Sequence, residues 1–409
     1  MNLFENKNLF ENRTIFNERL NTASSIYHLT HTDGDAVGCA VVLEMYKNLL
    51  FPFMGQANLV NTKIKTFYCG NGKIDETIER EVLPDKETDK VLIISDNTCS
   101  LSMWENLKKR KSEFSMIILI DHHKTNPIGN FDDDDVMCST ISDKAYVSAA
   151  AQMFEIFILD NVEYMRLANK RIGASYEKLL GATICNLHHV ISSISRYDTW
   201  AWMEIPSDFY KFRLGDSCKD VALIPDNQYQ EDLIAVICQE IGLEKTTRLI
   251  INHLMDLMRS GDIIHDKYLA FPKVFYTVYD LILEKLQKAV RDSEKKTVIK
   301  HVKFKGQVSY RTAIILADDS SRKVPEHLLS AYDKIDLVLM LFVDSCTLSF
   351  RSKGELDVSE IAKRFGGGGH LNAAGAKPGW ETFKEYLELY FDGMDNLQTI
   401  EYLNMDTLS

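Results

Sequence analysis

Histidine and aspartate side chains follow three short β-rich segments of the sequence, in a pattern that suits metal binding. These side chains are His31, Asp33 and Asp35 after residues 26–30, Asp96 after 91–95, and the triplet Asp121-His122-His123 after 116–120. A further candidate, Asp198, lies in the later segment 196–200. Imidazole and carboxylate groups that converge from several segments are typical ligands of divalent cations. The first group could instead cap a helix, because acidic side chains are favoured at helix N-termini.

Taken together, these side chains predict a centre of two divalent metal ions. Together they offer two histidines and four carboxylates as ligands. This set suits hard or borderline ions, Mn²⁺ before Mg²⁺. The eight cysteines contain no CxxC pair, which argues against a zinc–thiolate site. Two ions about 3.5–4 Å apart can share a bridging carboxylate and a bridging hydroxide that attacks phosphorus in line.

A glycine-rich segment near the C-terminus predicts a phosphate-binding motif. The motif comprises Arg351, Gly366, Gly367, Gly368, Gly369 and His370. Glycines let backbone N–H groups approach an anion closely, and the arginine and histidine could add charged hydrogen bonds. A flexible linker is the alternative for a glycine run, although a linker would not continue into His-x-x-Ala-Ala-Gly. We expect Ala373-Ala374-Gly375 to let a following helix pack tightly.

The segments around these motifs alternate between β-rich and helical patterns, which predicts an α/β fold with a mainly parallel sheet. The predicted strands of this part are 26–30, 65–69, 91–95 and 116–120, with helices such as 36–50 and 100–111 between them. In open α/β sheets, ligands bind beyond the C-terminal ends of the strands, where the metal-binding candidates lie. We expect Gly38 to let its helix approach its neighbours closely.

The same patterns predict four parts of the chain. These are an N-terminal leader (1–25), a catalytic domain (26–205), a helical insert or connector (206–295), and a smaller α/β C-terminal domain (296–409). The leader contains a short duplication, Asn-Leu-Phe-Glu-Asn, too short for a repeat architecture. The acidic run at 131–135 is predicted to be a solvated loop.

Composition limits the possible partners and locations. The chain has 409 residues and a net charge of -12, which argues against binding long duplex nucleic acid. No apolar run reaches the ~18–20 residues that a membrane span needs, and the charged N-terminus is unlike a signal peptide. Because the cysteines are scattered, we expect reduced thiols and a cytoplasmic protein.

These motifs, in this order, resemble those of the DHH phosphoesterase superfamily with its DHH-associated C-terminal domain. The resemblance covers most of residues 26–200 and 297–380. The segments Asp35-Ala36-Val37-Gly38-Cys39 and Tyr197-Asp198-Thr199-Trp200, with the long helical middle, are most similar to bacterial oligoribonucleases of the nanoRNase B type. Many relatives place the first histidine four residues before the first aspartate, where this chain has Leu29.

The resemblance implies a role for each motif. One metal ion would be bound by His31 and Asp33, the other by Asp35, His122 and Asp198, and Asp96 would bridge the two. In the catalytic motif, His123 would contact the scissile phosphate and Asp121 would orient its neighbours. The Arg351, Gly366–Gly369 and His370 motif would bind a substrate phosphate.

These implications predict an enzyme. We expect a metal-dependent phosphodiesterase, or exonuclease, that hydrolyses short oligoribonucleotides or linear dinucleotides to mononucleotides, as a possible homodimer. The alternatives are a cyclic-dinucleotide phosphodiesterase of the cyclic-di-AMP type and a non-catalytic nucleotide sensor. Metal-dependent turnover would separate an enzyme from a sensor.

Overall fold

The computed structural model divides the chain into two compact units, Met1–Tyr276 and Thr277–Ser409. The structure describes residues 13–49, 62–70, 72–123, 126–133, 136–141, 147–162, 174–199, 232–260, 271–304, 309–318, 321, 323–396 and 398. The duplicated Asn-Leu-Phe-Glu-Asn segment lies outside the described residues. The division into four parts stays a prediction.

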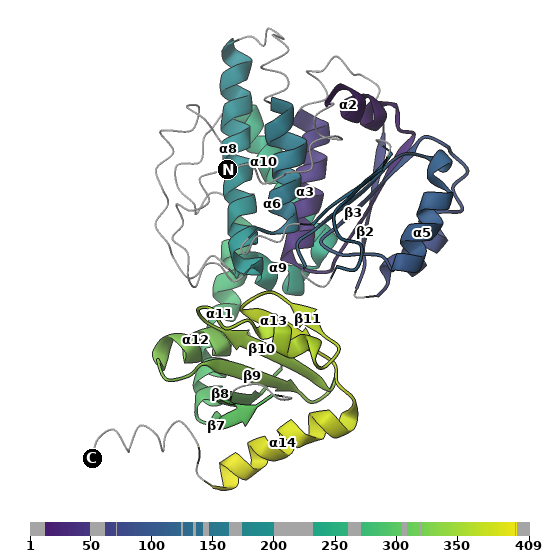
Figure 1. The fold of residues 1–409 in the computed structure, drawn as a ribbon. Coiled ribbons are helices and arrows are strands. Elements are labelled where there is room, and N and C mark those ends of the chain that lie inside the picture. The colour runs from purple at the N-terminus through teal and green to yellow at the C-terminus, as the bar shows by residue number, and fades with distance from the viewer. Residues whose placement is uncertain are drawn as a thin grey trace. The chain divides into compact units, whose positions relative to one another are not determined.

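The first unit contains a six-stranded sheet (Figure 1). Its strands are β1 (Ser25–Thr30), β2 (Lys63–Tyr68), β3 (Lys90–Ser95), β4 (Phe114–Asp121), β5 (Phe131–Asp133) and β6 (Met137–Ile141), in the order β2-β1-β3-β4-β6-β5. All neighbouring pairs are parallel except β5 and β6. Every residue of β1 and β3 is buried, as expected of strands covered by helices on both faces.

Helices cover both faces of this sheet. The elements of the first unit are α2 (Arg13–Thr22), α3 (Gly34–Leu49), α4 (Ile74–Thr77), η2 (Ile78–Val82), α5 (Leu101–Lys109), η3 (Lys111–Glu113), α6 (Ala149–Met153), η4 (Phe154–Leu159), α8 (Ala174–Asp198), α9 (Leu233–Ile241) and α10 (Leu243–Ser260). Figure 1 shows α3, α6, α8 and α10 on one side of the sheet and α5 on the other. Helix α10 packs against α3 and α8, so the helical segment after residue 232 belongs to this unit.

Gly38 lies at the closest approach of helices α3 and α6. A Cβ atom added at Gly38 would lie 2.7 Å from the Cβ of Ala150 and 3.3 Å from the Cγ2 of Ile194 in α8. Real Cβ atoms do not come this close, so only glycine permits this spacing. The predicted reason for Gly38 is therefore confirmed.

The second unit is built on a mixed six-stranded sheet. Its strands are β7 (Val298–Lys303), β8 (Ser309–Leu316), β9 (Leu337–Phe342), β10 (Thr347–Ser352), β11 (Gly368–Gly369) and β12 (Ala373–Ala376), in the order β11-β12-β10-β9-β8-β7. Among these described strands, only β8 and β9 pair in parallel. The helices are α12 (Val324–Ala331), α13 (Val358–Lys363) and α14 (Trp380–Asp395), while α11 (Lys273–Glu294) crosses the unit boundary. Apolar residues of the sheet, α13 and α14 form one core. The predicted fold class is confirmed by both sheets.

Three expectations from the sequence were wrong. Ala373-Ala374-Gly375 forms strand β12 beside β10 and does not prepare a helix contact, because small residues also allow close approach of strands. Phe131–Asp133 of the acidic run forms strand β5. Cys185 of α8 is disulfide-bonded, so the expectation of reduced thiols fails at this residue. Since a disulfide depends on which side chains meet in space, sequence spacing could not show it.

Candidate metal centre and phosphate-binding motif

The candidate metal ligands gather where strands β1, β3 and β4 end. Strand β2 lies on one side of β1 and β3 on the other, so the direction of winding reverses between β1 and β3. Such a switch point opens a crevice at the C-terminal strand ends. The loops that follow β1, β3 and β4 carry the predicted motifs to this edge, while Asp198 arrives from the last residue of α8.

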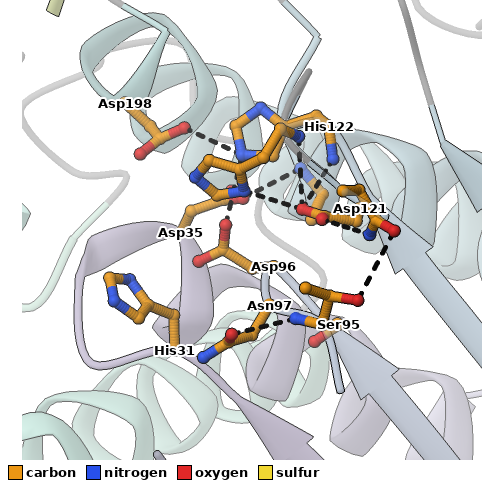
Figure 2. Close-up of polar contacts among 12 residues, drawn as sticks. His31, Asp35, Ser95, Asp96, Asn97, Asp121, His122 and Asp198 are labelled. Atoms are coloured by element: carbon orange, nitrogen blue, oxygen red, sulfur yellow. Dashed lines mark hydrogen bonds and ion pairs between the residues drawn. The ribbon is translucent and has the colours of Figure 1, made fainter. Parts of the chain in front are cut away.

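His122 lies among three carboxylates from different elements. Its Nε2 atom is 3.1 Å from Oδ1 of Asp96, 3.4 Å from Oδ2 of Asp198 and 3.7 Å from Oδ2 of Asp35. Figure 2 shows these four side chains gathered at one place. Ligands about 2.1 Å from an octahedral ion lie about 3 Å apart, so this spacing fits a shared cation.

The electrostatics of this cluster also favour a cation. Burial, and then repulsion from Asp33, Asp35 and Asp198, raises the pKa of Asp96 well above its ordinary value. Burial raises the pKa of Asp198 in the same way, with repulsion from Asp35 and Asp33. A divalent ion would offset this repulsion and favour the ionised carboxylates.

His122 is held in the form that binds metals. Burial lowers its pKa to about 3, and the charge of nearby His123 acts in the same direction. A neutral imidazole keeps a lone pair on one ring nitrogen, and this neutral form is the metal ligand.

The backbone at Asp96 directs its carboxylate into the cluster. Its φ of 52° lies in the left-handed region, which aspartate tolerates better than most residues. The N–H of Asp96 donates to the carbonyl of Ile120 at 2.9 Å, which fixes the turn after β3 against β4. Among the described residues, Oδ2 of Asp96 is buried without a hydrogen-bond partner. A buried polar atom of this kind is expected where an ion binds.

His31 and Asp33 form a second group beside Asp96. Nδ1 of His31 lies 2.6 Å from Oδ2 of Asp33, whose Oδ1 accepts the N–H of Ala36 at 3.1 Å. Burial would raise the pKa of Asp33, but the hydrogen bond and charge of His31 hold it below the ordinary value. Ligand atoms of His31, Asp33 and Asp96 all lie within 4.8 Å of one another.

Asp35 connects the cluster to helix α6. Its Oδ2 accepts the N–H of Ala149 at 2.8 Å, and its Oδ1 accepts the N–H of Ala150 at 3.2 Å. Burial raises the pKa of Asp35 to about 7, although a hydrogen bond from Ser148 opposes that rise. The helix-capping alternative holds in part through Asp33, whose Oδ1 accepts the N–H of Ala36 in the first turn of α3, while Asp35 binds the N-terminus of α6 as well as facing His122.

Asp121 organises the turn that carries both histidines. Its Oδ1 accepts the N–H of His122 at 2.8 Å and lies 2.7 Å from Nδ1 of His123. Burial would raise the pKa of Asp121, but the charge of His123 and its hydrogen bond hold it below the ordinary value. Asp121 is therefore ionised and engaged with its neighbours.

The structure thus brings the predicted ligands into two sets. One set is His31, Asp33 and Asp96, and the other is Asp35, His122 and Asp198. Asp96 also belongs to a group with Asp121, His122 and His123, so it lies next to both sets. Metal ligation by these residues stays a prediction.

The sequence analysis missed two amide side chains that contact this centre, Asn126 and Gln152. Asn126 donates from Nδ2 to Oδ2 of Asp121 at 2.6 Å, and Gln152 donates from Nε2 to the carbonyl of Asp121 at 2.9 Å. Asn126 follows the triplet Asp121-His122-His123 by three residues, and this proximity is a signal in the sequence. Gln152 carries no local signal, because its contact forms only in the folded chain.

Two glycines of the phosphate-binding motif predicted in the second unit have structural roles that the sequence did not indicate. Gly366 has a φ of 77° and donates to Lys363, while Gly367 donates to Ala362. These two bonds form a Schellman motif that ends α13. A Cβ at Gly367 would lie 2.0 Å from the carbonyl oxygen of Gly375, so this glycine is needed for strand packing.

The remaining residues of the motif lie at strand ends of the same sheet. Gly368 and Gly369 form β11, and the N–H of His370 donates to Ala373 at 2.8 Å. Arg351 in β10 donates from Nη1 to Oγ of Ser349 at 2.8 Å. The backbone N–H groups of Gly366, Gly367 and His370 are engaged within the chain, so phosphate binding would fall to the side chains and the later glycines.

Comparisons with known proteins found one matching domain and several solved structures with a similar fold. Residues 305–392 match the DHHA1 domain. A solved DHH domain, from a member of the s1p family of ribosomal proteins, has a TM-score of 0.62 at 16% identity, over 96% of this chain and 92% of that one. RecJ from Thermus thermophilus, in complex with Mn²⁺, has a TM-score of 0.50 at 16% identity, over 95% of this chain and 55% of that one.

The DHHA1 match and the fold similarity confirm the predicted resemblance to the DHH superfamily. A curated protein, oligoribonuclease NrnB of Bacillus subtilis (strain 168), is 22% identical over 354 residues, which are 86% of this chain and 72% of that protein. The two ligand sets of this chain fit a divalent metal ion. Among the described residues, no helix is long and apolar enough to cross a membrane.

Proposed function

We propose that this protein is a phosphodiesterase that hydrolyses short oligoribonucleotides or linear dinucleotides to mononucleotides, using two divalent metal ions, with Mn²⁺ preferred over Mg²⁺. The observation that carries the proposal is the convergence of three carboxylates on Nε2 of His122, beside the second set at His31 and Asp33. Six ligands in two adjoining sets, with Asp96 next to both, are what a dinuclear centre requires.

The chain's own residues would divide the work of catalysis. His31 and Asp33 would hold one ion, Asp35, His122 and Asp198 the other, and Asp96 both. Two ions bound there would activate a water molecule and offset the negative charge of the phosphate.

His123 would act on the substrate directly. Its Nδ1 is engaged by Asp121 at 2.7 Å, which fixes the ring, and we expect its Nε2 to meet a phosphate oxygen. Burial would lower the pKa of His123, but the charge and hydrogen bond of Asp121 raise it above the ordinary value. A protonated ring would donate a charged hydrogen bond to that oxygen.

Short RNA is the substrate class that the observations favour. The relative in Bacillus subtilis bears the name oligoribonuclease. The net charge of -12 would repel a long polyanion, whereas Arg351 and His370 could bind one or two phosphates of a short one. A cytoplasmic location and a homodimer stay predictions.

A substrate panel with Mn²⁺ tests this proposal. It would contain RNA of two to ten residues, a 50-residue single strand, duplex RNA, cyclic di-AMP and pyrophosphate. We expect mononucleotide products from the short RNAs and rates that fall steeply with length. Equal rates per end on a 3-residue and a 50-residue strand would reject the length preference. Preferred cleavage of cyclic di-AMP would favour the cyclic-dinucleotide phosphodiesterase. Binding of these nucleotides without turnover would favour the non-catalytic sensor.

A further inference from the structure

Every oxygen of Asp121 accepts a hydrogen bond, and two of the donors are neutral side-chain amides. Asn126 donates from Nδ2 to Oδ2 at 2.6 Å, and Gln152 donates from Nε2 to the main-chain carbonyl at 2.9 Å. The third oxygen, Oδ1, accepts the N–H groups of His122 and His123. Asp121 is 1% exposed, so water contributes little to holding it.

Asn126 joins the turn after β4 to the turn after β3. Its own N–H donates to the carbonyl of His123 at 3.0 Å. Its Oδ1 accepts the N–H of Ile128 at 2.9 Å and lies 3.4 Å from the hydroxyl of Thr98, which follows Asp96 by two residues. One amide therefore contacts both turns that carry predicted metal ligands.

Gln152 joins Asp121 to the helix that holds Asp35. It lies in α6, whose first N–H groups, from Ala149 and Ala150, bind the Asp35 carboxylate. The short helix thus fixes Asp35 at its N-terminus and Asp121 through a side chain on its next turn. The segments bearing Asp35, Asp96 and His122 are connected through these two amides.

Stability alone does not explain Gln152. Its side chain is fully buried, and its Oε1 has no hydrogen-bond partner among the described residues. A buried acceptor left unsatisfied costs about 1–3 kcal/mol. An apolar side chain of similar size would avoid this cost and lose only the hydrogen bond to the Asp121 carbonyl, so that contact is what Gln152 adds to the fold.

We propose that Asn126 and Gln152 are positioning residues that fix the turn Asp121–His123 for metal binding. The inference rests on the proposed function. A neutral donor suits this place, because a lysine or arginine would hold Asp121 equally well but would repel the nearby cations. Without either amide, Asp121, His122 and His123 can shift, so that His122 moves away from the other predicted metal ligands.

Calorimetric titration of the metal-free protein with Mn²⁺ tests this directly. Asn126→Ala and Gln152→Met should each weaken Mn²⁺ binding about ten- to a hundredfold, the usual effect of losing a partner of a metal ligand. Asn130→Ala is the matched control. Its Oδ1 accepts the N–H of Ile141 at the end of β6 at 2.6 Å, an exposed hydrogen bond to no predicted metal ligand, so the Mn²⁺ affinity of this variant should equal that of the wild type.

Two further measurements separate positioning from folding. Thermal unfolding of metal-free Gln152→Met should occur near the wild-type temperature, because the variant removes the unsatisfied Oε1 but also leaves the Asp121 carbonyl without its Nε2 donor. With saturating Mn²⁺ and a dinucleotide, kcat should fall in both variants while KM stays near the wild-type value. Wild-type Mn²⁺ affinity in either variant, or equal weakening in Asn130→Ala, would overturn the inference. Absence of Mn²⁺ binding to the wild type would instead overturn the proposed function.

Discussion

At the residue scale, the most informative position is Asp96. Its backbone lies in the left-handed region, its pKa is raised by burial and by three other carboxylates, and its Oδ2 has no hydrogen-bond partner among the described residues. Each feature costs free energy in the protein without metal. A bound cation would reverse the electrostatic part of that cost, so function and not stability accounts for this residue.

Replacing Asp96 should therefore have opposite effects with and without metal. Asp96→Asn keeps a residue that tolerates positive φ but removes one buried carboxylate. We expect turnover to be lost and less manganese to be bound, while the metal-free variant unfolds at a higher temperature than the metal-free wild type. Thermal unfolding with EDTA and with Mn²⁺, together with metal analysis, measures both effects. Full activity of the variant, or of the metal-free wild type, would contradict the assignment.

At the scale of elements, the contact between α3 and α6 decides whether Asp35 is correctly placed. Gly38→Ala would put a methyl group 2.7 Å from the Cβ of Ala150, and overpacking of this kind costs about 1–3 kcal/mol. Because α6 binds the Asp35 carboxylate, Mn²⁺ affinity should fall as well. The control is Gly181→Ala in α8, where an added Cβ meets nothing within 4 Å.

Urea unfolding measures the difference between the two glycine variants. Gly181→Ala should be neutral or stabilising by up to about 1 kcal/mol, since alanine favours helix more than glycine does. Gly38→Ala should be the less stable protein. Equal stability of the two variants would show that α3 and α6 can move apart without lowering the free energy of unfolding.

Strand β1 contains a buried histidine that makes stability depend on pH. Burial lowers the pKa of His28 to about 3 from 6.5, and its Nε2 lies 2.8 Å from the hydroxyl of Ser95 in β3. Between these two values the unfolded chain binds a proton that the folded chain does not. The free energy of unfolding therefore falls as the pH drops below about 6.5, by about 1.4 kcal/mol per pH unit.

A variant without the imidazole isolates this effect. His28→Gln keeps a polar group that can reach Ser95 but does not titrate. Urea unfolding of both metal-free proteins at pH 7.5 and 5.5 should show the larger loss of stability in the wild type. The same pH dependence in both proteins would mean that His28 is protonated, or accessible to protons, in the folded state.

At the scale of the whole molecule, the two units have different proposed tasks. The predicted metal ligands all belong to the first unit and Arg351 to the second. Arginine cannot ligate a cation, so Arg351→Ala should leave the manganese content unchanged. Loss of a charged hydrogen bond costs about 1.5–3 kcal/mol, so oligonucleotide binding should weaken about ten- to a hundredfold.

Steady-state kinetics on two substrates tests this division. Arg351→Ala should raise KM for a short RNA but cut a small chromogenic phosphodiester almost normally. Equal losses on both substrates would place Arg351 at the reacting phosphate, and loss of manganese would show that the units do not work separately.

The sequence by itself determined much of this protein. Apolar segments ending in aspartate or histidine predicted the strands β1, β3 and β4 and the residues at their ends, because strand period and ligand chemistry are local properties. Helical periodicity likewise predicted α9 and α11 in the segment after residue 206. The need for glycine at position 38 was also visible.

Tertiary structure decided the rest, because those features depend on which distant segments meet. The pairing of β12 with β10, the use of Gly366 and Gly367 as a helix end and a strand contact, and the disulfide at Cys185 have no local signal. Gln152 acquires its contact with Asp121 only when α6 packs beside the sheet. Likewise, the raised pKa of Asp96 exists only because folding buries it and brings it beside Asp33 and Asp35 of one segment and Asp198 of another.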